Sequence, residues 1–199
     1  MTKDRILEVA TKEFSKYGYD AVSMNSLSKL LDINKATIYY HFRDKKALYQ
    51  EVISNILEMT LGGIERVLEK KVNPREKFKI YIKARLETTR KCPHIVPLYL
   101  RETANFGSKI DENILMFFEK DLTILKKIVF ALDLKDKYKK TDPYVILSLI
   151  VGTVLNYYSF QMSHLEFKDA KDFNKDADSI LDYLTEFISN ILLDALCQN

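Results

Sequence analysis

The sequence contains few of the residues that interrupt regular structure. Its 199 residues include only 5 Gly and 4 Pro. So few turn-forming residues do not supply the many tight turns of a sheet protein. The apolar residues also recur at helical spacing rather than in strict alternation. We therefore predict an all-α fold.

Cysteine is equally scarce, and the two present, Cys92 and Cys197, lie far apart with no CxxC pairing. Two unpaired thiols suit a reducing cytoplasm. We interpret both as small buried hydrophobic residues rather than as a redox sensor. Cys92, His94 and His164 do not have the spacing of a zinc site. We predict neither a metal nor a cofactor.

Long apolar segments are missing as well. The N-terminus, MTKDRILEVATKEF, carries Asp4, Glu8 and Glu13 and so lacks the apolar stretch of a secretory signal. The longest apolar run, 145–155, falls short of the ~20 residues that a membrane-spanning helix requires. These features predict a cytoplasmic protein without membrane contact.

Known catalytic motifs do not occur either. The chain has no nucleophile elbow, no HExxH and no Gly-rich phosphate loop, and its 3 His form no defensible acid–base pair. Positive charge is instead concentrated at one end. Residues 1–50 hold nine Lys/Arg and six Asp/Glu, which accounts for the whole net charge of +3. A local basic excess of this size mildly favours a polyanionic partner.

The first fifty residues have the pattern of three short helices. Ile6, Ala10, Phe14 and Tyr17 recur at helical spacing, and Gly18 stands where a helix ends in a left-handed residue. This pattern predicts a first helix whose apolar side faces a core.

A second helix follows after a short link. Ser23 is a typical N-cap, Leu27, Leu30 and Leu31 are expected to point inward, and Asp32 occupies a tight turn. The helix is therefore only about two turns long.

The third helix has only two apolar anchors. Asn34 caps its start, and Ile38 and Phe42 form an i, i+4 pair. The second and third helices together have the spacing of a helix-turn-helix. The remaining side chains of the third helix have no core to enter.

Charges at two helix starts are unusual. Lys35 lies in the first turn of the third helix, and Lys45 and Lys46 follow the Asp44 cap of the next one, where a cation opposes the helix dipole. Free amides with added lysines suit phosphate oxygens. The alternative is an ordinary solvated face with a few lysines.

Residues from about 5 to 50 resemble the DNA-binding domain of the tetracycline-repressor (TetR) family of bacterial transcription regulators. The resemblance rests on TIYYHF at 37–42, followed by Asp44, Lys45 and Leu48. Asp32 and Ala36 stand where the family often has Gly. Asp tolerates the left-handed conformation, so neither departure threatens the fold. The resemblance implies a DNA-binding domain at 1–47 and an effector-binding and dimerisation domain at 48–199.

The resemblance also implies roles for individual residues at a DNA duplex. Side chains of the third helix would approach base edges in the major groove, and flanking residues would hold the backbone. The residues expected at base edges are Lys35, Ala36, Thr37, Tyr40 and His41. Those expected at phosphates are Tyr39 and Lys45, with Ser23 and Asn25 reaching the neighbouring backbone.

The rest of the chain predicts further helices. Apolar stripes and cap residues place them at 44–61, ending at Gly62 and Gly63, then at 74–90, near 93–106, at 111–132, 143–164 and 176–196. The lysine-rich segment 135–140 is interpreted as a solvated loop rather than a second DNA site.

The last helix has an unusually broad apolar stripe. Such a width exceeds what one neighbouring helix covers, so a second subunit is a reasonable source of the missing surface, although burial in one large core is the alternative. The resemblance implies a homodimer through the last two helices. The stripe comprises Ile180, Leu184, Phe187, Ile191 and Ala195, flanked by Leu181, Ile188 and Leu192.

A ligand cavity would combine apolar walls with isolated polar groups in the C-terminal region. Ordinary core packing explains each candidate at least as well, and the effector is not readable. The candidates are Tyr81, Tyr99, Phe106, Phe117, Asn156, Tyr157, Phe160, Gln161 and His164.

Taken together, the sequence predicts a homodimeric repressor that a small-molecule effector releases from a palindromic operator. Two other hypotheses stay open. The first is a helical enzyme acting on a small apolar substrate. The second is a protein that binds DNA without sequence preference, which competition with random duplex would reveal.

Overall fold

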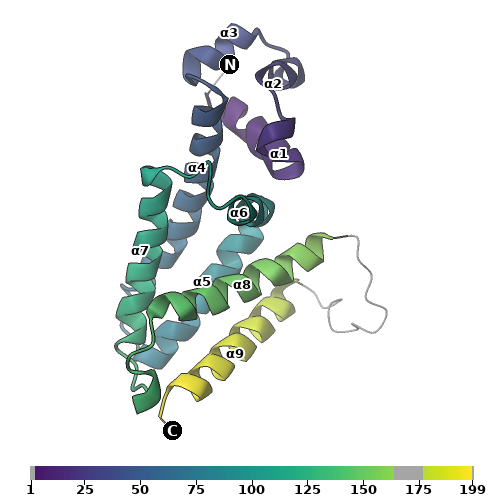
Figure 1. Ribbon diagram of the computed structural model, residues 1–199. Helices are drawn as coiled ribbons and strands as arrows, with labels where there is room; N and C mark the ends of the chain where they lie inside the picture. The colour runs from purple at the N-terminus through teal and green to yellow at the C-terminus, as the bar shows by residue number, and fades with distance from the viewer. Residues whose placement is uncertain (1–2, 164–176, 199) are drawn as a thin grey trace. The chain divides into compact units, whose positions relative to one another are not determined.

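The computed structural model describes residues 3–163 and 177–198, and its regular structure there is helical (Figure 1). The one strand-like feature in these ranges is an isolated bridge between Leu134 and Cys197. The prediction of an all-α fold is therefore confirmed. The helices are α1 Lys3–Ala21, α2 Met24–Leu31, α3 Lys35–His41, α4 Lys45–Glu65, α5 Pro74–Lys91, α6 Ile95–Ala104, α7 Glu112–Val129, α8 Pro143–Met162 and α9 Ala177–Leu196, with a 3-10 turn, η1, at Asp136–Tyr138.

Several helices begin where the sequence predicts. The side-chain oxygens of Asn73, Asp111 and Asp142 accept first-turn amides of α5, α7 and α8 at 2.9, 3.0 and 2.9 Å. These bonds satisfy donors that a helix start otherwise leaves open. The start expected for the last helix at Asp176 lies outside the described residues.

Several boundaries differ from the prediction, since α6 and α7 end at Ala104 and Val129 rather than near 106 and 132. Helix α4 does not stop at Gly62 but continues to Glu65. Gly inside a helix costs only about 1 kcal/mol relative to Ala, which packing easily offsets. A Cβ at Gly63 would lie 2.7 Å from Cγ2 of Thr88, so this glycine permits close approach to α5. The segment expected as a loop at 135–140 contains the turn η1.

The chain divides into two compact units. Unit 1 comprises Met1–Glu58 and Cys92–Phe117, and unit 2 comprises Met59–Lys91 and Phe118–Asn199. Unit 1 therefore holds α1, α2 and α3 together with α6, which the sequence did not predict. The functional boundary expected after residue 47 stays a prediction, because compactness and function are separate properties.

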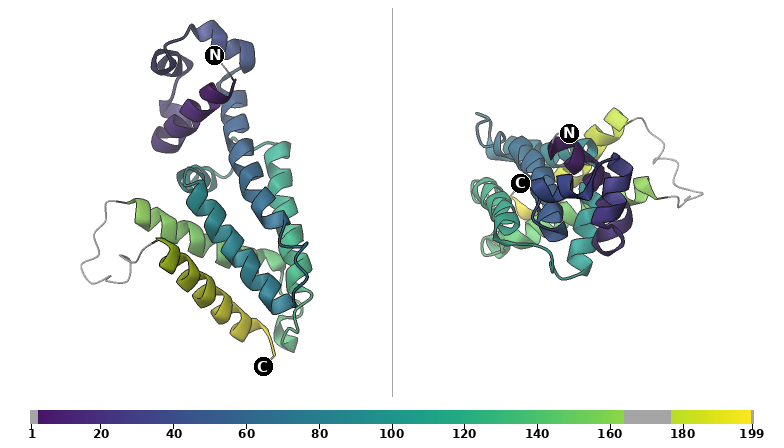
Figure 2. Two further views of the ribbon diagram at one scale, coloured as in Figure 1. Left: turned by 180° about the vertical axis from the view of Figure 1, so that it is seen from behind. Right: turned by 90° about the horizontal axis from the view of Figure 1, so that it is seen from above.

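In unit 1, α2 packs against both α1 and α3 (Figures 1 and 2). Ile6 and Phe14 of α1 are fully buried, as their spacing predicts. Leu27 and Leu31 hold the buried stripe of α2, which leaves Leu30, about 100° away from Leu31, 58% exposed. The expectation that Leu30 points inward is wrong.

Helix α6 is bonded to the N-terminal helices within unit 1. The hydroxyl of Tyr49 donates to the buried Glu102 carboxylate at 2.7 Å, and Arg101 donates to the carbonyl of Lys16 at 3.0 Å. Burial, followed by the bond to Glu102, raises the pKa of Tyr49 far above its ordinary value. Gly18 has φ 82°, and a Cβ there would lie 3.0 Å from Nη1 of Arg101. The positive φ expected at Gly18 is confirmed, but its ψ of 170° is not left-handed helical, and Gly18 is a kink after which α1 continues to Ala21 rather than the end of the helix.

Unit 2 is organised around α5, which contacts both α8 and α9. Phe78, Ile82 and Leu86 on α5 are fully buried. Each such side chain contributes roughly 1.5–3 kcal/mol relative to exposure. Lys83 pairs with Asp182 of α9 at 2.8 Å, but both side chains are exposed and such a pair adds little.

Helix α8 is apolar on its exposed side as well as its buried side. It is long and apolar enough to cross a membrane, but core helices of soluble proteins can have the same length and composition. Only 28% of its apolar window is buried inside the structure. Much of the apolar surface of α8 is therefore exposed in this structure.

Candidate nucleic-acid interface

The turn before α3 is fixed by side chain to backbone bonds. Ser23 accepts the amide of Ser26 at 3.0 Å, and Ser26 accepts the amide of Ser23 at 3.0 Å, which completes a capping box. Asp32 ends α2 at φ 53°, ψ 50°, the left-handed conformation predicted for it. Cap and turn together set the direction in which α3 leaves α2.

Two apolar side chains hold α3 against unit 1. Asn34 Oδ1 accepts the amide of Ala36 at 2.8 Å and starts the helix. Ile38 is fully buried and Phe42 is 3% exposed. Both anchors therefore lie where their i, i+4 spacing predicts, and the opposite side of the helix points away from the core.

The outward side of α3 carries tyrosines and polar groups. Tyr40 is 85% exposed, Tyr39 is 43% exposed, and Ala36 is also exposed. An edge-on contact with the His41 ring, centroid to centroid 5.1 Å, braces the Tyr40 ring. Lys35 Nζ lies 5.5 Å from the Tyr39 ring centroid. Two neighbouring tyrosine rings of α3 are therefore exposed.

The start of α4 adds a second cationic group. Asp44 Oδ1 accepts the amide of Ala47 at 2.8 Å, and this bond, with the Arg43 side chain, lowers the pKa of Asp44. Lys45 Nζ lies 4.3 Å from the Tyr19 ring centroid and donates to the Asp20 carbonyl at 3.4 Å. Burial lowers the pKa of Lys45 despite the opposing charge of Asp20.

Sequence reasoning missed two residues beside Lys45. The Tyr19 ring has a second cation over it, because Lys109 Nζ lies 4.9 Å from its centroid. The repulsion from Lys109 also lowers the pKa of Lys45. No local pattern could have signalled this cluster, since Lys109 follows α6 and reaches Tyr19 only through the fold of unit 1.

The candidates for an effector cavity do not all fall in one unit. Tyr99, Phe106 and Phe117 belong to unit 1, and Phe106 is 98% exposed, so it forms no enclosed wall there. Tyr81 in unit 2 is fully buried, and its hydroxyl donates to Asp121 at 2.9 Å. His164 lies outside the described residues. The other candidates in unit 2 are exposed or half-buried: Asn156, Tyr157, Phe160 and Gln161.

The helix-turn-helix and its exposed α3 face coincide with a known family. Residues 6–52, from α1 into α4, match the sequence model of bacterial regulatory proteins of the tetR family. The match covers the DNA-binding helices and not the helices after α4. It confirms the resemblance inferred from TIYYHF, and the chain is a DNA-binding transcriptional regulator.

Individual relatives extend the likeness beyond the N-terminal helices. The HTH-type transcriptional regulator YhgD of Bacillus subtilis is 26% identical over 160 residues, which cover 78% of this chain and 83% of that protein. The negative transcriptional regulator IcaR of Staphylococcus aureus, which acts on the biofilm operon icaADBC, is 39% identical over 51 residues. That match covers 26% of this chain and only 27% of that protein.

A solved structure shares the complete fold. The transcriptional regulator FadR from Bacillus subtilis, in complex with stearoyl-CoA, superposes with a TM-score of 0.71 at 15% identity, covering 98% of this chain and 99% of that one. At this identity the likeness concerns the fold alone.

The two sides of α3 predict opposite effects on stability. Ile38→Ala leaves a cavity under a fully buried side chain and should lower the free energy of unfolding by about 2–5 kcal/mol. Tyr40→Ala, at a side chain 85% exposed, should change it by no more than about 0.5 kcal/mol. Urea unfolding followed by circular dichroism measures both. A large loss for Tyr40→Ala would show that the outward face is covered by the protein itself.

Proposed function

We propose that this regulator is a repressor that binds a palindromic operator as a homodimer and leaves it when a small-molecule effector binds. The observation that carries the proposal is the outward face of α3, where Tyr40 is 85% exposed although Ile38 on the opposite side is fully buried. IcaR, a relative over the DNA-binding region, is a negative regulator. On this proposal the protein acts in the cytoplasm, where its operator DNA would lie.

In the proposed complex α3 lies in the major groove. The Thr37 hydroxyl and methyl and the exposed Ala36 fit base edges and a thymine methyl, while Lys35 and His41 supply donors. Tyr40 is 85% exposed and carries a hydroxyl on a rigid stem. These five side chains are proposed to read the sequence, since none of them is buried: Ala36 and Tyr40 are exposed, and Lys35, Thr37 and His41 are half-exposed.

Backbone contacts surround this reading face. Tyr39 and Lys45 are proposed to hold phosphates, and Ser23 and Asn25 at the start of α2 the neighbouring backbone. The ring of Tyr19 and the Asp20 carbonyl hold Lys45 in place. A cation positioned in this way loses less side-chain entropy when it meets a phosphate.

The dimer is proposed to form through α8 and α9. On α8, Val145 and Leu149 are 51% and 54% exposed one turn apart, and on α9, Phe187 and Ile191 are 51% and 52% exposed one turn apart. Part of the broad stripe of α9 is buried within unit 2, namely Leu181, Leu184 and Ile188. What remains outside is a second apolar stripe with helical spacing. A second copy covers it with the same surface under two-fold symmetry.

Two-fold symmetry also explains how affinity arises. Two α3 helices about 34 Å apart would occupy successive major grooves of one duplex. The effector, bound in the region 48–199, would favour a dimer in which this spacing no longer fits. Such coupling requires only about 1–3 kcal/mol. The fold of FadR, which holds stearoyl-CoA, supports a small-molecule effector here.

The proposed DNA contacts predict a division of effects among variants. Tyr39→Ala and Lys45→Ala should weaken operator binding and flatten its salt dependence, since each removes a phosphate contact. Thr37→Ala and Tyr40→Ala should chiefly change which sequences are preferred, by about 1–3 kcal/mol per base contact. Fluorescence anisotropy over a range of salt concentrations measures both.

Matched controls come from the same unit. Tyr17 is 48% exposed on α1, and Lys12 pairs with Glu8 at 2.7 Å, so Tyr17→Ala and Lys12→Ala should leave affinity and salt slope unchanged. If the α3 and α4 variants bound like these controls, the assignment of the interface would be wrong. Equal affinity for random duplex would instead favour DNA binding without sequence preference.

The proposed dimer surface predicts that a Phe→Glu substitution has different effects at two positions. Phe187→Glu places a charge in the proposed interface and should yield a monomer of 23.3 kDa where the unaltered protein forms a dimer. Phe130→Glu alters a phenylalanine that is 53% exposed beyond α7 and should remain dimeric. Sedimentation equilibrium distinguishes the two masses. A dimer that persists in Phe187→Glu, or a monomer before any substitution, would contradict the proposed interface.

A further inference from the structure

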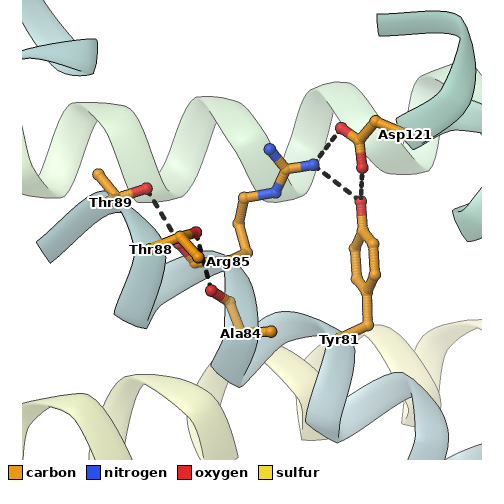
Figure 3. A network of polar contacts seen from close by, with 6 residues as sticks. All are labelled: Tyr81, Ala84, Arg85, Thr88, Thr89 and Asp121. Atoms are coloured by element: carbon orange, nitrogen blue, oxygen red, sulfur yellow. Dashed lines mark hydrogen bonds and ion pairs between the residues drawn. The ribbon is translucent and has the colours of Figure 1, made fainter. Parts of the chain in front are cut away.

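Unit 2 contains a buried charged cluster that the DNA-binding function does not use. Arg85 of α5 and Asp121 of α7 form an ion pair, and their side chains are only 11% and 10% exposed. The Tyr81 hydroxyl joins them: it donates to Asp121 at 2.9 Å and accepts from Nη2 of Arg85 at 3.0 Å. We call these three residues the Arg85 cluster. Figure 3 shows both bonds of Arg85 ending on one terminal nitrogen.

One donor of the cluster is left over. Nε of Arg85 is buried and has no hydrogen-bond partner among the described residues. The nearby polar groups on α5 are occupied, since Thr88 and Thr89 donate to carbonyls of their own helix. A buried donor without an acceptor costs about 1–3 kcal/mol, so native proteins rarely retain one without a use.

Charge decides which acceptor fits this donor. Arg85 remains protonated, and Asp121 already neutralises it. A second carboxylate beside the pair would leave a net negative charge in a buried site, which is costly. An uncharged oxygen, such as a carbonyl, accepts the Nε–H bond without changing the net charge. On the same helix, Phe78, Ile82 and Leu86 are apolar and fully buried.

We propose that the Nε–H of Arg85 is the polar anchor for the effector and that it selects an apolar molecule carrying an uncharged carbonyl oxygen, as in a ketone, an ester or an amide. This inference rests on the proposed effector response. Of the cavity candidates, Tyr81 would act indirectly, because it orients Arg85 and Asp121 and does not contact the ligand.

The position of the cluster also suits coupling. The donor is covered in this structure, so a ligand oxygen reaches it only after neighbouring side chains move. Helices α5 and α7 meet at the ion pair, and α8 joins α5 one residue further on, where Tyr158 donates to the Leu86 carbonyl at 3.1 Å. A ligand that binds only the rearranged packing has different affinities for two states, which is the requirement for shifting an equilibrium.

The test compares a ketone with a carboxylate of the same chain length. Isothermal titration calorimetry without DNA should show that 2-decanone binds roughly tenfold or more tightly than decanoate. Arg85→Lys keeps a cation for Asp121 but loses the guanidinium donor, so ketone binding should weaken by roughly tenfold or more. Asp121→Asn removes the neutralising charge and should shift the preference towards decanoate.

The control is Arg66→Lys, because Arg66 is exposed and its Nε–H already donates to the Gly62 carbonyl at 3.1 Å. This variant should bind 2-decanone like the unaltered protein. Failure of 2-decanone to bind, equal binding of ketone and carboxylate, or an Arg85→Lys variant with unchanged ketone affinity would each overturn the proposal and leave the Arg85 cluster a purely structural ion pair.

Operator binding, measured separately by anisotropy, distinguishes this inference from the proposed function. Sequence-specific DNA binding without ketone binding would refute the anchor and leave the repressor proposal standing. If the unaltered protein did not bind DNA sequence-specifically, the repressor proposal would be refuted, whatever calorimetry shows for Arg85.

Discussion

The account depends on how α3 is anchored. Ile38 within this seven-residue helix and Phe42 at its C-cap are the buried anchors, whereas Ala36, Tyr39 and Tyr40 are exposed. A helix this short is not stable by itself, so its packing and the Asn34 cap must hold it. Because the anchors occupy one side only, residues on the other side do not determine the fold and can vary to suit a binding partner.

Local chemistry explains why so much of the fold could be predicted. Caps at Ser23, Asn34 and Asp142, and the left-handed Asp32, are specified by a side chain and its own neighbouring backbone. Helical spacing of apolar residues then gives the buried side of each helix. Where several apolar residues compete for one side, as with Leu27, Leu30 and Leu31, spacing alone does not say which one is exposed, and tertiary packing decides.

Interactions between distant parts of the chain could not be predicted in this way. The bond from Tyr49 to Glu102 brings α6 into the same unit as α1, and Lys109 shares the Tyr19 ring with Lys45. The Arg85 cluster joins α5 to α7. Each depends on the packing of complete helices, so neither composition nor spacing reveals it. The cavity candidates were likewise predicted by residue type. Arg85 was not among them, because a charged residue is not expected in an apolar cavity wall.

The central claim is that the outward face of α3 binds DNA sequence-specifically and that a dimer presents two such faces to one duplex. Selection of bound duplexes from a random pool, followed by sequencing, tests it most directly, because it reports partner, specificity and symmetry together. The account predicts enrichment of an inverted repeat whose half-site centres lie about one helical turn, or a multiple of it, apart. Enrichment of a single unrepeated site, or of no sequence at all, would contradict it.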